Sequence, residues 1–333
     1  MKIAAYEVRP DEKPIMEDRC NELGIDVIMT DKNLDDTTVE MSKGCDGVTT
    51  LGQSTFTKGV IDYMAENGVK VVAFRCVGYD RIDVDYARSK GLKICHGSYA
   101  PNGVAEYTVM AILMCLRKAK KAEYNTDDND FTLKGKMGRE LRSLTVGVIG
   151  AGKIGYTVIK LLSGFGCRIL AYDIYQNDEV RKLAEYTDLD TIYREADVIT
   201  LHTNLTADTE KMINSDAINK MKNGVIIVDN ARGNLLDIDA IIKGVETEKI
   251  GALFLDAFPG EEGIIHEPHD EDIIRTPNMP YFKLKYLRSF VNVVHTPHMA
   301  FFTEEAAKSM ALSGVDGIYE VLTTGKSAHE VPQ

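Results

Sequence analysis

The chain has 333 residues, more than one compact core normally accommodates, so two domains are expected. Apolar residues make up 44% and charged residues 27% of the sequence, proportions that exclude disordered and fibrous proteins. The formal net charge of −12 excludes nucleic acid as an expected partner, because binding to a phosphate backbone needs a concentrated positive field.

Targeting signals and metal motifs are not expected. No stretch approaches the roughly 20 uncharged apolar residues that span a bilayer, and Glu7 comes too early for a signal peptide. We therefore expect a cytoplasmic protein without a membrane partner. The six cysteines form no C-x-x-C pair, which predicts reduced thiols and no metal site or redox motif.

The first hundred residues alternate short β-branched runs with helical patterns. This alternation predicts a parallel α/β sheet. The expected strands cover residues 2–6, 26–29, 47–50, 69–74 and 92–95. A long helix is predicted over residues 102–121, directly after Pro101, and it leads into a second domain.

A second α/β unit begins after a polar stretch that ends at Arg139. Six expected strands cover residues 144–149, 168–172, 198–202, 225–229, 251–255 and 292–295. Six strands separated by helices predict a doubly wound nucleotide-binding sheet. Residues 263–289 are the least regular segment, either a surface excursion or a flap over the active site.

The last predicted element is an amphipathic helix over residues 304–322, which we expect to return to the first domain. The predicted fold therefore has two Rossmann-like α/β domains. One is a discontinuous, flavodoxin-like domain of residues 1–100 and 299–333, and the other is a nucleotide-binding domain of residues 101–298.

A glycine motif lies directly after the predicted strand over residues 144–149, where the next helix begins. It reads Gly150-Ala151-Gly152-Lys153-Ile154-Gly155. Between a strand and a helix, the first glycine allows the tight turn, the second allows close approach of a pyrophosphate, and the third allows helix and strand to pack. The N–H groups and dipole of the helix start then bind the anion, so the motif predicts a dinucleotide site.

Asp173 ends the next predicted strand, about twenty residues further on. Its carboxylate can accept hydrogen bonds from the adenosine ribose and would repel a 2′-phosphate. No Arg or Lys follows in Ile174-Tyr175-Gln176, so the sequence predicts NAD rather than NADP.

Three further strand ends carry chemically useful groups: Arg232, Glu261 and His298. The carboxyl ends of strands are where α/β sheets bind ligands. Reduction of a 2-keto acid needs a cation for the carboxylate and carbonyl, a proton donor, and a carboxylate that keeps the donor protonated. Arg232, His298 and Glu261 fit these roles in turn. We expect His298 and Glu261 to meet, although about thirty-seven residues separate them.

With these motifs in this order, the chain resembles the D-isomer-specific 2-hydroxyacid dehydrogenase family over nearly its whole length. Two features make it most similar to the D-lactate and D-2-hydroxyisocaproate dehydrogenase branch. They are the long segment between Glu261 and His298 and the pair Val77-Gly78. The resemblance implies NAD-dependent reduction of a 2-keto acid to the D-hydroxy acid, a cleft that holds NAD between two lobes, and a homodimer.

The resemblance also implies residue roles. Val77 and Gly78 would offer N–H groups to the substrate carboxylate, and Tyr99 and Phe301 would line the substrate pocket, although core packing accounts equally well for these two rings. Pocket volume would depend on how Leu51, Met299 and these rings pack. The predicted cofactor contacts are Gly150, Gly152, Lys153, Ile154, Gly155, Asp173, Thr203, Asn204, Asn230, Ala231 and Asp256.

The chain departs from the branch at three places. Residues 96–98 read His-Gly-Ser where the branch has Asn-Val-Pro, Asn204 replaces a common proline, and Asp229 replaces a common asparagine. Substrate preference is therefore open between pyruvate and larger branched or aromatic 2-keto acids. The alternatives are another family enzyme, such as a phosphoglycerate or formate dehydrogenase, and an NADH-sensing corepressor that binds peptides.

Overall fold

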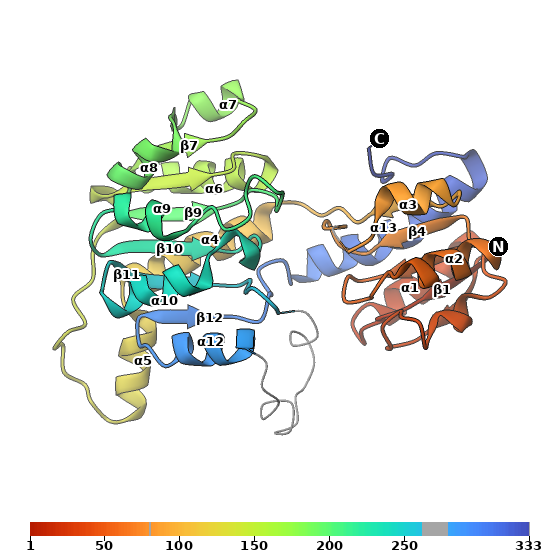
Figure 1. Cartoon of the computed structure of the whole chain (residues 1–333), viewed down its shortest axis with the longest axis horizontal. Coiled ribbons are helices and arrows are strands. Elements are labelled where there is room, and N and C mark those ends of the chain that lie inside the picture. The colour runs from red at the N-terminus through yellow and green to blue at the C-terminus, as the bar shows by residue number, and fades with distance from the viewer. Residues whose placement is uncertain (80, 262–278, 333) are drawn as a thin grey trace. The chain divides into compact units, whose positions relative to one another are not determined.

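The structure is a computed structural model that describes residues 1–79, 81–261 and 279–332, with side chains described from residue 281 onward after the second gap. Most of the irregular segment predicted over residues 263–289 lies outside these residues. The chain divides into two compact units, residues 1–100 with 302–333 and residues 101–301 (Figure 1). Each unit is built around its own parallel sheet.

The first unit contains a five-stranded parallel sheet in the order β2-β1-β3-β4-β5, the order of flavodoxin-like folds. Its strands are β1 (Lys2–Ala5), β2 (Asp26–Met29), β3 (Gly47–Thr50), β4 (Val71–Phe74) and β5 (Lys93–His96). All five expected strands are present within two residues of their predicted ends, because β-branched runs bounded by turns mark buried strands well.

Helices cover both faces of this sheet, as a buried parallel sheet requires. They are α1 (Lys13–Leu23), α2 (Lys58–Glu66), α3 (Val84–Ser89) and α13 (Glu304–Thr324), with a short 3₁₀ helix, η1 (Val39–Ser42). Alternate strand residues face opposite ways: Ile3 packs in the cluster that includes α1 and α13, and Ala4 packs with α2 and α3. The expected helix over residues 304–322 is thus present.

The second unit contains a seven-stranded parallel sheet in the order β12-β11-β10-β9-β6-β7-β8 (Figure 1). Its strands are β6 (Thr145–Ile149), β7 (Arg168–Tyr172), β8 (Glu185–Tyr186), β9 (Val198–Leu201), β10 (Val225–Asp229), β11 (Ile250–Leu255) and β12 (Val293–His295). Counted from β6, this is the doubly wound order 3-2-1-4-5-6 with one added strand. The predicted fold class is confirmed, but the prediction of six strands was wrong because two-residue β8 has no periodicity to detect.

Two hydrophobic clusters cover the faces of the second sheet. The surrounding helices are α4 (Asn102–Leu116), α5 (Ala119–Asp127), α6 (Lys153–Ser163), α7 (Asp178–Arg181), α8 (Leu189–Glu195), α9 (Ser215–Lys220), α10 (Ile238–Glu246) and α12 (Met279–Arg288), with 3₁₀ helices η2 (Leu141–Ser143) and η3 (Gly233–Leu235). The single helix predicted over residues 102–121 was wrong at its end. Lys118 adopts a left-handed conformation (φ 51°), which separates α4 from α5.

None of the helices described is long and apolar enough to cross a membrane. Four of the six cysteines are buried, and burial raises the pKa of the Cys115 thiol to about 12.

Candidate functional site

The glycine motif connects β6 to α6, and two of its glycines are required by packing. Gly150 has φ 92°, and a Cβ there would lie 2.6 Å from the carbonyl carbon of His202. A Cβ on Gly155 would lie 1.9 Å from the carbonyl oxygen of Gly150. A Cβ on Gly152, in contrast, would meet no described atom within 4 Å. The backbone of the turn is therefore accessible at its second glycine.

The start of α6 lies at this accessible turn. Gly152 is the N-cap residue, and it has no side chain that could accept hydrogen bonds from the first-turn N–H groups. Lys153 and Ile154 occupy the first turn. Unsatisfied N–H groups together with the positive end of the helix dipole favour an anion at this position.

Asp173 follows β7 and is bonded directly to the glycine turn. One carboxylate oxygen accepts the N–H of Ala151 at 2.7 Å, and the other accepts the N–H of Tyr175 at 2.8 Å. An ionised carboxylate has about four acceptor sites, so both oxygens retain capacity for ribose hydroxyls. The same side chain thus fixes the turn and faces the expected position of the ribose.

His298 and Glu261 form the centre of the second group of candidate residues. His298 Nδ1 lies 2.6 Å from Glu261 Oε1, as the sequence predicts. The backbone of His298 is left-handed (φ 53°) directly after Pro297, and its N–H donates to the carbonyl of Thr296 at 2.9 Å. Because Nδ1 is engaged with Glu261, the predicted proton exchange with a substrate would use the other ring nitrogen, Nε2.

A tight turn positions Glu261. Its N–H donates to the carbonyl of Phe258 at 3.2 Å, and its Oε2 accepts the N–H of Phe258 at 2.8 Å. Pro259 and Gly260 are the central residues, with Gly260 at φ 79°, a combination typical of a type II turn. Both carboxylate oxygens of Glu261 are therefore held, one by the turn and one by His298.

Asp256, at the end of β11, fixes the segment that carries His298. Its Oδ1 accepts the Thr296 hydroxyl at 2.5 Å and the Met299 N–H at 2.9 Å, and its Oδ2 accepts the Ala300 N–H at 2.7 Å. The side chain is almost fully buried. The sequence predicted that Asp256 contacts the cofactor. It did not predict these hydrogen bonds, because they depend on the approach of two segments about forty residues apart.

Arg232 lies after β10, at the same sheet edge. A Cβ on neighbouring Gly233 would lie 2.1 Å from the carbonyl carbon of Phe258, so this glycine allows the Arg232 loop to approach the Glu261 turn. Arg232 Nη1 donates to the carbonyl of Ala231 at 2.8 Å. Strands β10, β11 and β12 are neighbours, which brings Arg232, Glu261 and His298 to one edge.

Two buried polar atoms at the end of β10 have no hydrogen-bond partner among the described residues: Asp229 Oδ2 and Asn230 Oδ1. Asp229 Oδ1 accepts the N–H of Ala231 at 2.9 Å, and Asn230 Nδ2 donates to the Thr108 hydroxyl at 3.0 Å. Burial raises the pKa of Asp229 to about 8. A largely neutral carboxylic acid at this position resembles the asparagine that the branch usually has.

The electrostatic environment distinguishes His298 from the other strand-end histidines of this unit. Burial lowers the pKa of His202 to about 3 and that of His295 to about 4. Burial also acts to lower the pKa of His298, but the hydrogen bond and charge of Glu261 outweigh it and raise this pKa above the ordinary value. His298 is therefore the one of these three histidines whose pKa is raised rather than lowered.

Comparison with known proteins agrees with this geometry. The family model described as "D-isomer specific 2-hydroxyacid dehydrogenase, NAD binding domain" matches residues 109–300. The chain belongs to the D-isomer-specific 2-hydroxyacid dehydrogenase family. It is 39% identical over 93% of its length to an aromatic 2-oxoacid reductase of Clostridium sporogenes, 93% of which is covered.

Two further members of the family extend the comparison to the full chain. A D-lactate dehydrogenase of Lactobacillus delbrueckii subsp. bulgaricus is 37% identical over 98% of this chain and 97% of its own. The solved structure of a D-2-hydroxyisocaproate dehydrogenase matches with a TM-score of 0.87 at 31% identity, covering 99% of both chains. The predicted branch is therefore confirmed.

The residues of this dehydrogenase fit NAD, the cofactor of the matched family domain. The accessible turn at Gly152 and the first turn of α6 suit the pyrophosphate, and Asp173 suits the ribose. Thr203 and Asn204 follow β9, which pairs with β6, so they lie at the same edge as the glycine motif. Individual contacts of these residues with NAD stay predictions.

The predicted substrate contacts of this dehydrogenase are divided between the two units. Val77 and Gly78 follow β4, and Val77 is exposed. Tyr99 is half-buried at the end of the first unit, and Phe301 in the second packs edge-on against the His298 ring at 6.4 Å between centroids.

Gly97, one of the departures from the branch, is required by packing in this chain, because a Cβ there would lie 2.9 Å from the N atom of Cys76.

Proposed function

We propose that this chain is an NADH-dependent reductase that converts a small 2-oxo acid into the (R)-2-hydroxy acid. The observation that carries the proposal is the 2.6 Å contact of His298 with Glu261 at the sheet edge that also carries Arg232. This arrangement supplies a cation, a proton donor and a carboxylate, which together are what 2-oxo acid reduction needs.

Arg232 binds the substrate in this proposal. A planar guanidinium can donate two parallel hydrogen bonds, so it can hold the carboxylate and polarise the carbonyl oxygen. The fixed approach of the Arg232 loop to the Glu261 turn, imposed by Gly233, keeps the cation beside the proton donor.

His298 supplies the proton. NADH, when bound, provides the hydride that the carbonyl carbon receives. The Nε2–H of His298 donates its proton to the carbonyl oxygen, which becomes the hydroxyl group, and Glu261 stabilises the protonated ring beforehand. In the reverse direction the neutral ring accepts the hydroxyl proton, so one residue serves both directions.

The proposal assigns residues 101–298 to the cofactor and residues 1–100 with 299–333 to the substrate. Val77 and Gly78 would donate backbone N–H groups to the substrate carboxylate, and Tyr99 and Phe301 would contact its side chain. The relatives reported above carry the names of enzymes, which favours a reductase over a corepressor. The cytoplasmic location stays a prediction from the sequence.

The substrate test is an assay of NADH absorbance with pyruvate, 2-ketoisocaproate, phenylpyruvate and 2-ketoglutarate. The two relatives are named for an aromatic 2-oxoacid and for D-lactate, so we expect turnover of pyruvate, phenylpyruvate or both. Chiral analysis of the product should show the (R)-hydroxy acid. No turnover of any of the four acids, with NADH bound, would contradict the proposal.

Arg232→Lys tests the binding role directly. Lysine keeps the charge but lacks the paired donors, so the loss in kcat/KM should correspond to about 2–4 kcal/mol of transition-state stabilisation. Binding of NADH, measured by fluorescence titration, should stay close to that of the unmodified enzyme. A near-normal kcat/KM in this variant would remove Arg232 from the mechanism.

We also propose a homodimer, supported by exposed apolar side chains on α5 and on the segment that follows it. These side chains are strongly exposed within the chain: Tyr124 on α5 at 59%, and Phe131 at 73%, Leu133 at 86% and Met137 at 86% after it. Contiguous exposed apolar groups of this kind mark contact surfaces. Leu133→Asp should shift the mass measured by light scattering from that of a dimer to that of a monomer.

A further inference from the structure

Glu7 occupies the position in the first unit where a doubly wound sheet normally binds a ligand. The strand order β2-β1-β3-β4-β5 reverses between β1 and β3, and ligands bind outside the carboxyl ends of the strands at such a reversal. Glu7 follows β1, and residues 51–54, here named the 51–54 loop, follow β3.

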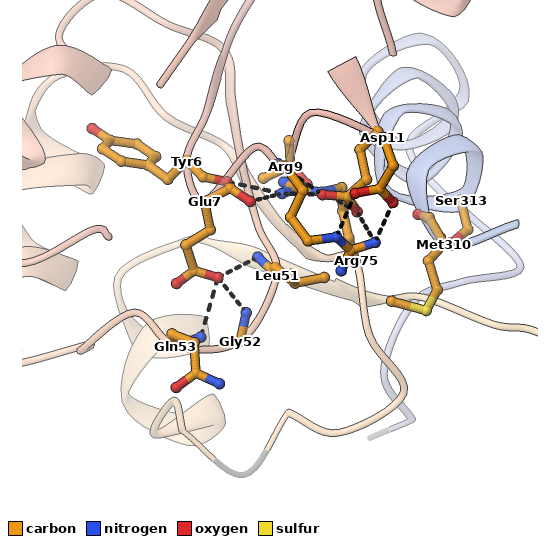
Figure 2. Close-up of polar contacts among 12 residues, drawn as sticks. Tyr6, Glu7, Arg9, Asp11, Leu51, Gly52, Gln53, Arg75, Met310 and Ser313 are labelled. Carbon is orange, nitrogen blue, oxygen red and sulfur yellow. Dashed lines mark hydrogen bonds and ion pairs between the residues drawn. The ribbon is translucent and has the colours of Figure 1, made fainter. Parts of the chain in front are cut away.

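The Glu7 carboxylate accepts four hydrogen bonds from this loop. Figure 2 shows those from Leu51, Gly52 and Gln53. Glu7 Oε2 accepts the N–H groups of Leu51 at 2.7 Å, Gly52 at 2.6 Å and Gln53 at 3.1 Å, and Oε1 accepts the Ser54 hydroxyl at 2.5 Å. Consecutive N–H groups that converge on one point form an anion-binding nest. Here the anion is a side chain of the chain itself, and it is only 7% exposed.

The backbone of Glu7 is held in an unfavourable conformation so that the carboxylate reaches the nest. Its φ is 55°, a left-handed value that is strained for a residue with a Cβ. Arg75 Nη2 donates to the carbonyls of Tyr6 and Glu7 at 2.9 Å each (Figure 2). Arg75 is itself fixed by an ion pair with Glu12. The arrangement is therefore fixed from both sides.

Leu51 is the residue through which the nest would act on the substrate. It is one of the residues on which the volume of the substrate pocket is expected to depend, and its N–H is one of the three that Glu7 accepts. We propose that Glu7 is a positioning residue that fixes the 51–54 loop, and with it the pocket wall at Leu51, by acting as the bound anion of the nest. This inference rests on the proposed function, because only a substrate pocket gives the loop a catalytic consequence.

Glu7→Gly tests the inference because glycine tolerates φ 55° and removes the carboxylate alone. Without an acceptor, the amide hydrogens of residues 51–53 should exchange with solvent about 10-fold faster or more. KM for 2-oxo acids should rise about 10-fold with a smaller change in kcat, and the ratio of KM values for pyruvate and phenylpyruvate should change. The Kd for NADH should be unchanged.

Rescue by formate provides the decisive readout. Sodium formate supplies a free carboxylate of the same chemistry, so it should slow the amide exchange and lower KM in Glu7→Gly, whereas sodium chloride at equal ionic strength should do neither. The matched control is Glu248→Gly. Glu248 is an exposed glutamate in the second unit with φ 58°, so this variant relieves the same backbone strain without a nest.

Several outcomes would overturn the inference: unchanged amide exchange in Glu7→Gly, unchanged KM values, or the same changes in Glu248→Gly. If Glu7→Gly does not fold, Glu7→Gln decides, because a neutral amide oxygen is a weaker acceptor for the three N–H groups than a carboxylate and should raise both KM and exchange. The exchange experiment needs no turnover. A wild type without reductase activity would therefore contradict the proposed function, and normal exchange in an active variant would contradict this inference alone.

Discussion

At the carboxyl edge of the first sheet, the Glu7 carboxylate accepts the N–H groups of residues 51–53. At the carboxyl edge of the second sheet, helix α6 begins after Gly152, which has no side chain to accept the N–H groups of the first turn. Both edges present converging N–H groups. The first is closed by the chain, and the second is accessible at Gly152. The difference indicates that the second unit binds an external anion and that the first fixes its own loops.

The buried ion pair of the first unit provides the largest expected effect on stability. Arg75 and Glu12 have fully buried side chains with an N–O distance of 3.3 Å, so Glu12→Ala leaves a guanidinium buried without its partner. Unfolding by urea should show a loss of about 3–5 kcal/mol. Glu17→Ala, which breaks the exposed pair with Lys13, is the matched control and should change stability by less than about 0.5 kcal/mol. Equal losses of stability in Glu12→Ala and Glu17→Ala would show that the buried Arg75–Glu12 pair does not fix the first edge.

His298→Gln should have the largest effect on turnover in the second unit. Glutamine cannot exchange a proton, so this variant lacks the proposed proton donor. We expect kcat to fall about 10³-fold in reduction and in oxidation of the hydroxy acid, with the Kd of NADH retained. Steady-state kinetics in both directions provide the measurement, and a defect in one direction only would contradict the role of His298.

Gly152→Asp would make the second edge resemble the first. A Cβ at this position meets no described atom within 4 Å, and the backbone φ of −67° suits any residue, so the fold should be retained. The new carboxylate would compete with the pyrophosphate for the N–H groups of α6 and repel it. The Kd for NADH should rise about 100-fold, with Gly152→Ala as the matched control. Unchanged NADH affinity in Gly152→Asp would place the pyrophosphate elsewhere.

Glu261→Gln has the smallest expected effect, a shift of a pH profile. Glu261 raises the pKa of His298, so replacing its carboxylate with an amide should lower this pKa. The alkaline decline of kcat/KM for reduction, which follows loss of the His298 proton, should move to lower pH. Oxidation near neutral pH should be less affected, because it uses the neutral ring. Superimposable profiles would show that Glu261 does not tune His298.

Local sequence patterns predicted the features that depend on local physics. The strands are β-branched runs between turns, and the glycine motif and the strand-end positions of Arg232, Glu261 and His298 follow from their neighbours in the chain. Helix α4 was predicted to run through Lys118 because no glycine or proline marks the left-handed residue at which it ends. The apolar periodicity simply continues past that point.

The sequence did not predict the structural roles of Glu7 and Asp256, two carboxylates that act across the fold. Glu7 in the sequence is indistinguishable from a surface glutamate, and its role appears only when β1 and β3 are neighbours. The hydrogen bonds of Asp256 likewise depend on β11 lying beside β12. Long-range hydrogen bonds of this kind have no periodicity, so composition and spacing contain no signal for them.

The left-handed backbone of His298 is strained and lowers stability, whereas the side chain of the same residue serves the proposed proton transfer. At φ 53° a residue with a Cβ is strained, and glycine would relieve about 1 kcal/mol of that strain. Selection for thermal stability alone would therefore favour glycine at position 298 and remove the proposed proton donor. A stability screen of this enzyme should for that reason enrich inactive variants at this position, and the histidine persists there only where turnover is also selected.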